Sequence, residues 1–171
     1  MVAQLTQIRD NQKERFLNLY NLYLYDLSGF LGDDPRSDGK FDANHAYVYI
    51  EKKELYPFFI EAENKVVGFI LVCAHPYVPE GVDYTIQELF VLKKYRGRNI
   101  ATQAVKLVFD QFQGRYKVEQ LKINKLATTF WDKVYKDLTI ETTRGEESIE
   151  IEGISGTHKL VSQIFDIPSS Q

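Results

Sequence analysis

The sequence predicts an α+β fold with a mixed, mostly antiparallel sheet of about seven strands and helices on both faces. Apolar runs of strand length recur along the chain, and one of them, VVGFILVCA, is apolar enough to lie at the centre of a sheet covered on both sides. Longer segments between these runs carry apolar residues at helical spacing. Together these patterns indicate helices packed on a sheet.

Composition limits the class of protein. The 171 residues, 44% apolar and 13% aromatic, fit a single globular domain over residues 1–171. A formal net charge of −3 argues against general nucleic-acid binding. The single cysteine, Cys73, excludes an internal disulfide and a cysteine metal cluster. No apolar run approaches the ~18 residues of a membrane span, so we expect a cytoplasmic protein with no membrane association.

The N-terminal third is predicted to alternate between short elements and loops. A short strand is expected over Val2–Arg9, followed by a helix over Asn11–Ser28 that Gly29 closes. Gly32–Asn44 has the composition of a loop, and His45–Leu55 favours a short helix leading to the sheet.

The centre of the chain reads as a hairpin and a third strand. A strand beginning at Pro57 and a strand over Val66–Ala74 flank a turn at Glu63–Lys65, with Asn64 at its tip. Tyr84–Val91 has period two, which predicts Thr85, Gln87 and Leu89 on one side and Ile86, Glu88 and Phe90 on the other.

The remaining elements follow from the same patterns. A helix is expected from Ile100 to Phe112, stopped at Gly114 by a left-handed cap, and then a strand over Lys117–Ile123. A short helix over Asn124–Tyr135 precedes three predicted strands, Leu138–Thr142, Ile149–Ile154 and Lys159–Asp166. The exposed last strands make a homodimer plausible.

A basic turn precedes the helix that begins at Ile100. It carries Lys93, Lys94, Arg96 and Arg98 beside Gly97. The first amides of a helix lack partners within it and the helix dipole is positive there, so this turn suits a phosphate or pyrophosphate. A solvated basic loop is the alternative interpretation.

Two motifs in this region resemble a known family. Residues Arg96–Ala101, RGRNIA, resemble the R/Q-x-x-G-x-G/A signature of the GCN5-related N-acetyltransferases (GNAT). Asn124, Ala127, Phe130 and Trp131 resemble that family's N-x-x-A-x-x-F-Y segment, and the resemblance extends over Pro57–Trp131. The whole chain is most similar to a small bacterial branch of predicted acetyltransferases.

The resemblance implies a GNAT-like fold and transfer of an acetyl group from acetyl-CoA, as co-substrate and without a metal, to a primary amine on a small molecule or peptide. Transfer would be direct, in a ternary complex. It also implies a cofactor site formed by Phe90, Val91, Arg96, Gly97, Arg98, Asn99, Ile100, Ala101, Asn124, Phe130 and Trp131.

Glu88 is the candidate catalytic base. It is the one carboxylate inside an apolar strand, and burial would raise its pKa toward that of a useful base. A paired structural carboxylate is the alternative. Tyr23, Tyr25 and Asp26 are candidates for binding the acceptor because the family's first helix borders that site; otherwise the tyrosines pack a broad helix face with their hydroxyls at its wet edge.

Two positions depart from the family pattern. Asn99 replaces the central glycine, although Asn tolerates a positive φ well. Trp131 replaces a tyrosine that serves many members as general acid, and its indole N–H is no proton-transfer acid at neutral pH. A catalytically degenerate module that binds acyl-CoA therefore stays open as an alternative. A different nucleotide-binding α/β domain is less favoured because the chain has no G-x-G-x-x-G run.

Overall fold

Seven strands form one sheet in residues 1–170, which the computed structural model describes. Their order is β1-β2-β3-β4-β5-β7-β6, and every neighbouring pair is antiparallel except β4 and β5. The strands are β1 (Ala3–Gln7), β2 (Leu55–Ala62), β3 (Lys65–Ala74), β4 (Tyr84–Val91), β5 (Gly114–Leu121), β6 (Thr143–Ile151) and β7 (Ile154–Ile167). The predicted mixed, mostly antiparallel sheet is confirmed.

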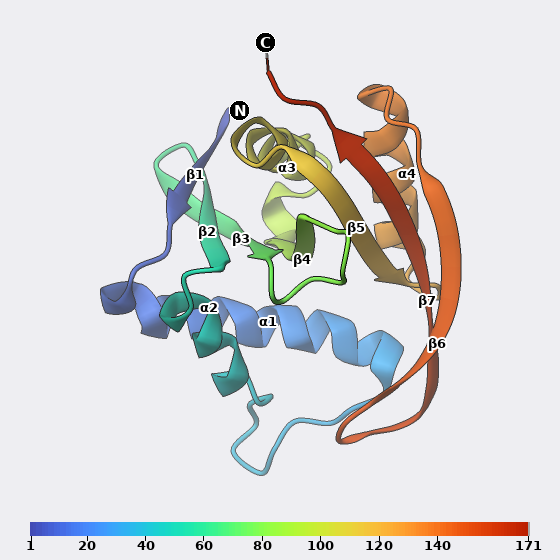
Figure 1. The fold of residues 1–171 in the computed structure, drawn as a ribbon. Coiled ribbons are helices and arrows are strands. Elements are labelled where there is room, and N and C mark those ends of the chain that lie inside the picture. Colours follow the sequence, from blue (N-terminus) through green and yellow to red (C-terminus); the bar gives the residue numbers. More distant parts are fainter. Residues whose placement is uncertain (171) are drawn as a thin grey trace.

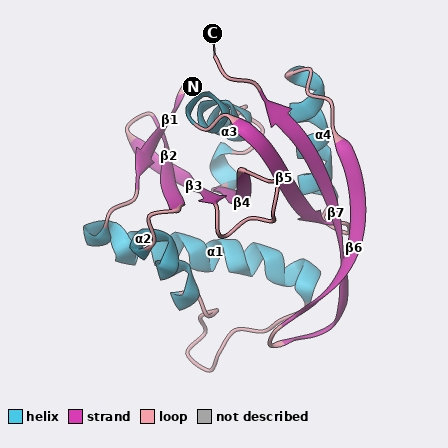
Figure 2. Ribbon diagram, in the orientation of Figure 1, coloured by secondary structure: helices cyan, strands magenta, loops and turns pink. Residues whose placement is uncertain are grey.

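Helices cover both faces of this sheet, as the sequence predicts (Figures 1 and 2). One face carries α1 (Lys13–Leu31) and the short α2 (Val48–Glu51), and the other carries α3 (Ile100–Gln111) and α4 (Lys125–Asp137). Three single-turn 3₁₀ helices connect the elements: η1 (Asp10–Gln12), η2 (Asn44–Tyr47) and η3 (Lys93–Tyr95).

The sheet separates two apolar cores. Ile70 and Val72 of β3 face the core under α3 and α4, while Phe69 and Leu71 face the core under α1 and α2. All four side chains are fully buried. The near-continuous apolar run therefore has the cause that the sequence indicates: β3 is covered on both sides.

The β2–β3 hairpin turns at Glu63–Asn64, within the predicted turn Glu63–Lys65, and Lys65 already belongs to β3. Glu63 and Asn64 both adopt positive φ, 53° and 61°. Two successive left-handed residues are typical of the turn type whose twist matches that of the flanking strands.

Helix α1 is longer than predicted. It continues through Gly29 and ends at Gly32, whose φ of 77° gives the left-handed cap and whose N–H donates to Ser28 O at 2.8 Å. Gly29 occupies an open part of the helix surface, so the chain has no steric reason to leave the helix there. The extra turn brings Leu31 to the edge of the site described below.

Gly114 does not cap α3, contrary to the prediction. The helix ends at Gln111, its C-cap residue Phe112 is extended, and Gly114 is the first residue of β5 with a φ of 151°. A Cβ at Gly114 would lie 2.6 Å from the carboxylate of Asp83, which accepts a hydrogen bond from the Arg115 amide. The glycine is required by this close approach of two strand ends.

The C-terminal region contains two strands where three were predicted. Leu138–Thr142 is not a strand, because α4 ends in a reversal at Thr139 (φ 55°) in which Ile140 N–H donates to Tyr135 O at 2.8 Å. Strands β6 and β7 form one long hairpin that turns at Glu152–Gly153, within the predicted strand Ile149–Ile154. One edge of β7 pairs with β5 from Gly114↔Ile167 to Leu121↔Leu160.

Candidate functional site

The opening between β4 and β5 is where the sheet is interrupted. The two strands run parallel, and they pair only through Tyr84 and Tyr116 at their beginnings. Beyond that pair, no strand within residues 1–170 continues the ladder on this edge of β4. Because each strand keeps its partner on the other side, β3 or β7, the sheet divides into two halves that separate toward the C-terminal ends of β4 and β5.

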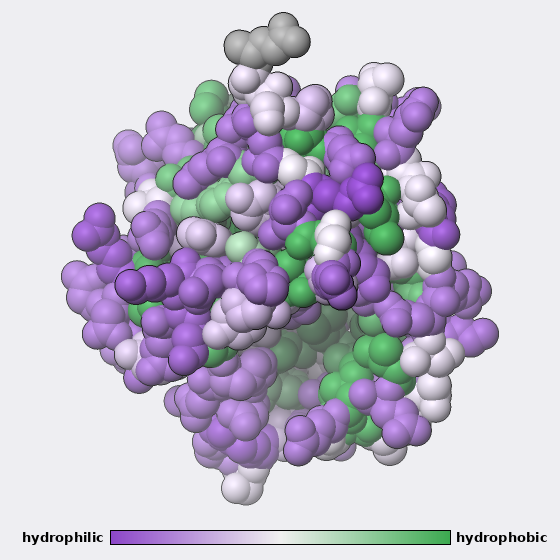
Figure 3. Space-filling view, in the orientation of Figure 1, coloured by the Kyte–Doolittle hydropathy of each residue, from purple (hydrophilic) through white to green (hydrophobic). Residues whose placement is uncertain are grey.

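A cavity of about 460 Å³ fills this opening. Its walls come from β4, β5, the end of α1, the β3–β4 loop, the start of α4 and the β6–β7 hairpin. Lining residues include Tyr23, Leu31, Tyr77, Glu88, Asn124, Trp131 and Ile149. In Figure 3 a recess with apolar walls and a hydrophilic rim lies between α1 and the β6–β7 hairpin.

A β-bulge at Gln87 determines which way Glu88 points. Leu71 on β3 pairs with Glu88, whereas the next residue, Val72, pairs with Ile86, so Gln87 is the extra residue. A bulge breaks the strict alternation of a strand. Ile86 therefore packs with the α3 and α4 core, while Phe90, which alternates with Glu88, packs with the α1 core. The predicted placement of Ile86 on the same side as Glu88 and Phe90 is wrong for this reason.

Two tyrosines of α1 surround the Glu88 carboxylate. The Tyr23 hydroxyl donates a hydrogen bond to its Oε2 atom. Burial raises the pKa of Glu88 to about 8, and a hydrogen bond with the Tyr20 hydroxyl acts in the opposite direction. A carboxyl group with this pKa exchanges a proton close to neutral pH.

The three α1 residues predicted to bind an acceptor have different positions. Tyr23 lies in the cavity beside Glu88. Tyr25 is 63% exposed and lies near the Phe41 ring, outside the cavity lining. Asp26 forms an ion pair with Arg96. The structure thus brings Tyr23 to the predicted base and Asp26 to the predicted cofactor turn.

The basic turn contains two residues in the left-handed conformation. Gly97 and Asn99 both adopt left-handed φ values, 72° and 63°. Asn99 is the N-cap residue of α3, and its carbonyl accepts from the Gln103 amide at 3.1 Å, whereas its side chain makes no capping bond. The substitution of Asn for glycine therefore preserves the local backbone path. Buried Ile100 then anchors the first turn of α3 in the core, with Ala101 half-buried next to it.

Arg96 makes three contacts within the protein. Its Nε donates to the carbonyl of Val91 at 2.6 Å, its Nη2 pairs with Asp26, and its guanidinium lies 5.6 Å from the centre of the Phe90 ring. The side chain joins the basic turn to the end of β4 and to α1. Arg98, Lys93 and Lys94 are exposed.

The Val91 backbone faces the opening. The next amide, that of Leu92, donates to Val67 O on the β3 side at 2.8 Å. Successive amides of an extended chain point to opposite sides, so the Val91 amide is directed away from β3, toward the gap beside β5.

Gly68 allows this arrangement, and sequence reasoning missed it. A Cβ at Gly68 would lie 2.0 Å from the carbonyl oxygen of Phe90. No other residue fits here without displacing the end of β4. The available signal was a lone glycine inside an otherwise apolar strand, which commonly marks a close backbone approach.

The predicted α4 residues divide between a cap and the core. Asn124 is the N-cap of α4, and its side-chain oxygen accepts from the Ala127 amide at 3.1 Å. Trp131 is 5% exposed, stacks on Tyr135 at 5.8 Å and contacts the half-buried Phe130 edge to face. Asn124 and Trp131 also line the cavity.

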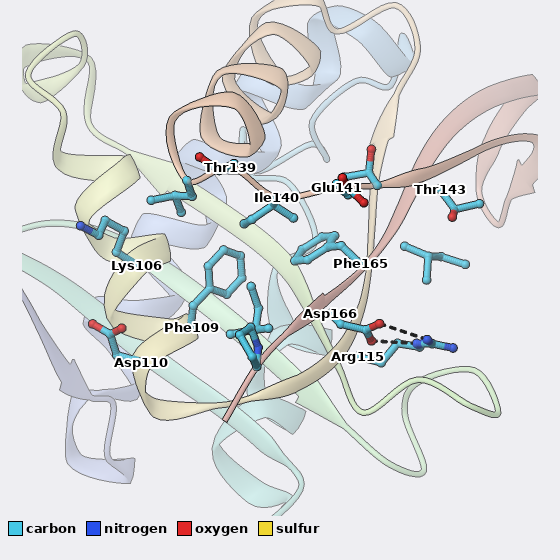
Figure 4. Close-up of a pocket in the computed structure, with 15 residues that line it drawn as sticks. Lys106, Phe109, Asp110, Arg115, Thr139, Ile140, Glu141, Thr143, Phe165 and Asp166 are labelled. Carbon is cyan, nitrogen blue, oxygen red and sulfur yellow. Dashed lines mark hydrogen bonds and ion pairs between the residues drawn. The ribbon is translucent and has the colours of Figure 1, made fainter. Parts of the chain in front are cut away.

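A larger cavity of about 890 Å³ lies elsewhere, beside the C-terminal half of α3 and the chain that follows α4 (Figure 4). Phe109, Ile140 and Phe165 line it, and the Arg115–Asp166 ion pair lies at its rim. Its charged groups are exposed, and the pKa shifts of that pair come from their mutual ion pair. The smaller cavity holds the half-buried Glu88, whose carboxyl pKa is raised, and is the candidate active site.

Within residues 1–170, no group of three or more His, Cys, Asp or Glu side chains is arranged to hold a metal ion. None of the helices in that range is long and apolar enough to cross a membrane.

Comparison with known proteins connects this site to a family. The model of the acetyltransferase (GNAT) family matches residues 13–135. A search of curated protein sequences finds no significant match.

Solved structures share the fold at low sequence identity. An N-acetyltransferase from Staphylococcus aureus superposes with a TM-score of 0.66 at 14% identity, covering 98% of this chain and 100% of that one. The ribosomal-protein-S18-alanine N-acetyltransferase from Escherichia coli gives 0.63 at 9% identity, covering 99% and 97%. An acetyltransferase from Thermus thermophilus gives 0.62 at 13% identity, covering 96% and 97%. With the family match over most of its length, this chain belongs to the GNAT acetyltransferase family.

Proposed function

We propose that this protein is an acetyl-CoA-dependent N-acetyltransferase that acetylates a primary amine directly, in a ternary complex. The observation that carries the proposal is Glu88, a carboxyl group with a pKa near 8 in the cavity between the diverging strands β4 and β5. An ammonium group must lose a proton before it can attack a thioester, and a group that titrates near neutral pH suits that task.

In this mechanism each part of the cavity has one role. The pyrophosphate would bind the backbone amides of the turn at Gly97–Ile100 and the exposed guanidinium of Arg98. The pantetheine arm would enter the gap beside β4. The amine would approach Glu88 from the α1 side, near Tyr23, and the Val91 amide would donate to the oxyanion that forms at the thioester carbon.

Arg96 has a different role from the one its place in the motif suggests. Its guanidinium is already bound to Asp26 and to the Val91 carbonyl. We assign it the task of fixing the basic turn against β4 and α1. The thiolate leaving group would take its proton from water or from Tyr23, since the Trp131 indole is no acid at neutral pH.

Calorimetric titration with acetyl-CoA tests the cofactor site. We expect binding by the wild type, weaker binding by Arg98→Glu, and unchanged binding by Lys65→Glu, a charge-matched control at the exposed β2–β3 hairpin. Equal affinity in all three proteins would remove the turn from the cofactor site. Release of free CoA thiol with a panel of peptide and small-molecule amines then tests transfer.

A second candidate is a catalytically degenerate module that binds acyl-CoA. The engaged Arg96, the side chain added at Asn99 and the absence of an acid at Trp131 favour it. It predicts cofactor binding with no thiol release on any amine, and no change in behaviour when Glu88 is replaced by Gln.

A further inference from the structure

Part of the cavity wall is apolar without belonging to either apolar core. The residues concerned come from three separate segments: Leu27 and Leu31 of α1, Tyr77 of the β3–β4 loop, and Ile149, Ile151 and Leu160 of the β6–β7 hairpin. These six residues form the apolar wall. Apolar side chains that gather at a surface outside the core commonly mark a binding site.

The apolar wall begins next to the proposed base. Tyr23, whose hydroxyl donates to Glu88, is followed on α1 by Leu27 and Leu31 at intervals of four residues. Residues at this spacing lie on one side of a helix, and eight residues of helix extend over about 12 Å. The α1 part of the wall therefore runs from the carboxyl group outward to the end of the helix. An amine held at Glu88 would have the rest of its molecule along this stripe.

The β6–β7 hairpin supplies the opposite side of the apolar wall. Ile149 and Ile151 of β6 and Leu160 of β7 are half-buried and line the same cavity. In Figure 3 the recess between α1 and this hairpin is apolar. A ligand in the recess is therefore enclosed between two apolar surfaces.

The other charged residues of the cavity lining are already paired. Apart from Glu88, they are Lys117 and Glu119 of β5. Lys117 Nζ lies 3.1 Å from Oε1 of Glu119 and 3.3 Å from Oε1 of Glu147, an exposed residue of β6. A second ammonium or a carboxylate on the acceptor would thus find no free counter-charge among the described residues that line the cavity, and an unpaired charge is costly to bury.

We propose that the acceptor is a primary amine carried on an uncharged, apolar body, either an alkyl or aryl group or the apolar side chain of the first residue of a peptide. The inference rests on the acetyl transfer proposed above and specifies its substrate class. Transfer converts the ammonium group and acetyl-CoA into an amide, the free CoA thiol and one proton, which Glu88 takes first. The body of the acceptor lies between α1 and the β6–β7 hairpin. Amines with several charges, such as polyamines and aminoglycosides, are then poor acceptors.

Steady-state kinetics with two pairs of amines of matched shape test the class. Pentylamine and putrescine differ in a terminal methyl or ammonium group, and leucine amide and aspartate amide differ in an isopropyl group or a carboxylate. We expect kcat/KM to be at least about tenfold higher for the apolar member of a pair, and to rise about fourfold for each methylene from propylamine to pentylamine. Turnover of leucine amide without turnover of pentylamine would identify the peptide as the source of the apolar amine.

Matched variants test the apolar wall. Leu27→Glu places a charge in the wall, so we expect the KM for pentylamine to rise about tenfold or more, with acetyl-CoA affinity unchanged. Leu22→Glu is the control, because Leu22 is 48% exposed on the same helix and lies outside the cavity lining. Ile149→Glu repeats the test on the hairpin, with Ser148→Glu at the exposed neighbouring position of β6 as its control. Unchanged pentylamine kinetics in both wall variants would overturn the inference.

A binding measurement separates failure of this inference from failure of the transferase. Saturation-transfer NMR with the CoA-bound protein detects amine binding without turnover. Pentylamine that binds the wild type and not Leu27→Glu, with no acetyl transfer, would support the apolar wall and remove the transferase. Putrescine and aspartate amide acetylated as fast as their apolar counterparts would overturn the apolar acceptor and leave the transferase intact. Absence of binding by every amine in the two pairs would also overturn it.

Discussion

Two polar clusters, one half-buried and one buried, lie on opposite faces of the same sheet. On the α1 face, Glu88 accepts a hydrogen bond from Tyr23 beside a cavity. On the α4 face, Gln120 and Gln163 exchange two hydrogen bonds, at 2.8 and 3.1 Å, and the Tyr135 hydroxyl donates to Gln163 at 3.0 Å.

The clusters differ in whether their members can gain or lose a proton. Each amide of the glutamine pair donates and accepts, and neither residue titrates. The Glu88 cluster includes a carboxylic acid that is costly to ionise in its desolvated position. This acid lies next to an open cavity. The comparison teaches that burial and hydrogen bonding alone do not distinguish a structural cluster from a functional one; an ionisable member next to a cavity does.

The largest expected effect is on catalysis. Glu88→Gln keeps the shape of the side chain and removes the base, so we expect the rate of acetyl transfer to fall at least about 100-fold with acetyl-CoA affinity retained. Glu80→Gln, at an exposed position in the β3–β4 loop, is the matched control. Full activity of Glu88→Gln would show that the Glu88 cluster, like the glutamine cluster, has no part in catalysis.

The same variant tests the cost of burial through pH. The pKa of Glu88 is about 8 in the folded protein against 4.5 for an ordinary glutamate, so between these values the folded state retains a proton that the unfolded chain has lost. Wild-type stability should therefore fall relative to Glu88→Gln as the pH rises from 4.5 to 8, then stay level. Denaturant titrations across that range measure the difference; a difference independent of pH would contradict the raised pKa.

On the other face, Gln163→Ala should act on stability alone. It leaves the Gln120 amide and the Tyr135 hydroxyl buried without partners, which costs about 3 kcal/mol of unfolding free energy. Chemical denaturation measures the loss. The turnover per folded molecule should match that of the wild type, and a large loss of activity in folded protein would show that this cluster is functional as well.

Gly68→Ala tests the backbone between the two clusters. The added methyl group would meet the Phe90 carbonyl oxygen at 2.0 Å, so the end of β4 has to move. We expect a loss of about 2 kcal/mol of stability, typical of overpacking, together with weaker acetyl-CoA binding by calorimetry. Gly29→Ala, at an open helix position, is the control and should leave affinity unchanged.

The smallest effect is expected at the end of α4. Thr139 has a left-handed φ of 55° in a position where glycine is favoured. Thr139→Gly should raise the unfolding free energy by about 1 kcal/mol, because a β-branched residue is strained there. Activity should be unaffected, and thermal unfolding is the simplest measurement. Destabilisation by this substitution would mean that the Thr139 side chain makes a compensating contact.

Much of the fold was predictable because its signals are local. The hairpin turn at Asn64, the apolar faces of α3 and the cap at Asn124 each depend on residues close in sequence. The helix ends at Gly29 and Gly114 were misplaced, since any glycine permits a cap and tertiary contacts decide which one is used. The predicted strand at Leu138–Thr142 was wrong for a similar reason, because the reversal at the end of α4 occupies those residues.

The site was predictable residue by residue but not in its connections. Glu88 stood out as a carboxylate in an apolar strand, and Arg96 as part of a motif. Their partners depend on contacts between residues that are 65 and 70 positions apart, Tyr23 with Glu88 and Asp26 with Arg96. The bulge at Gln87 arises from the pairing of β4 with β3, and nothing within β4 itself signals it.

The single backbone bridge between β4 and β5 has a mechanical consequence. Beyond that bridge and the adjoining hydrogen bond from the Asp83 amide to the Arg115 carbonyl, the two halves of the sheet are joined by side chains of the core that they share with α3. Apolar packing has no preferred direction, whereas a ladder of hydrogen bonds fixes strand spacing to within a fraction of an ångström. The gap beyond the bridge can therefore widen or narrow as substrates enter and products leave without breaking backbone hydrogen bonds. The apolar contacts of α3 would adjust to that change.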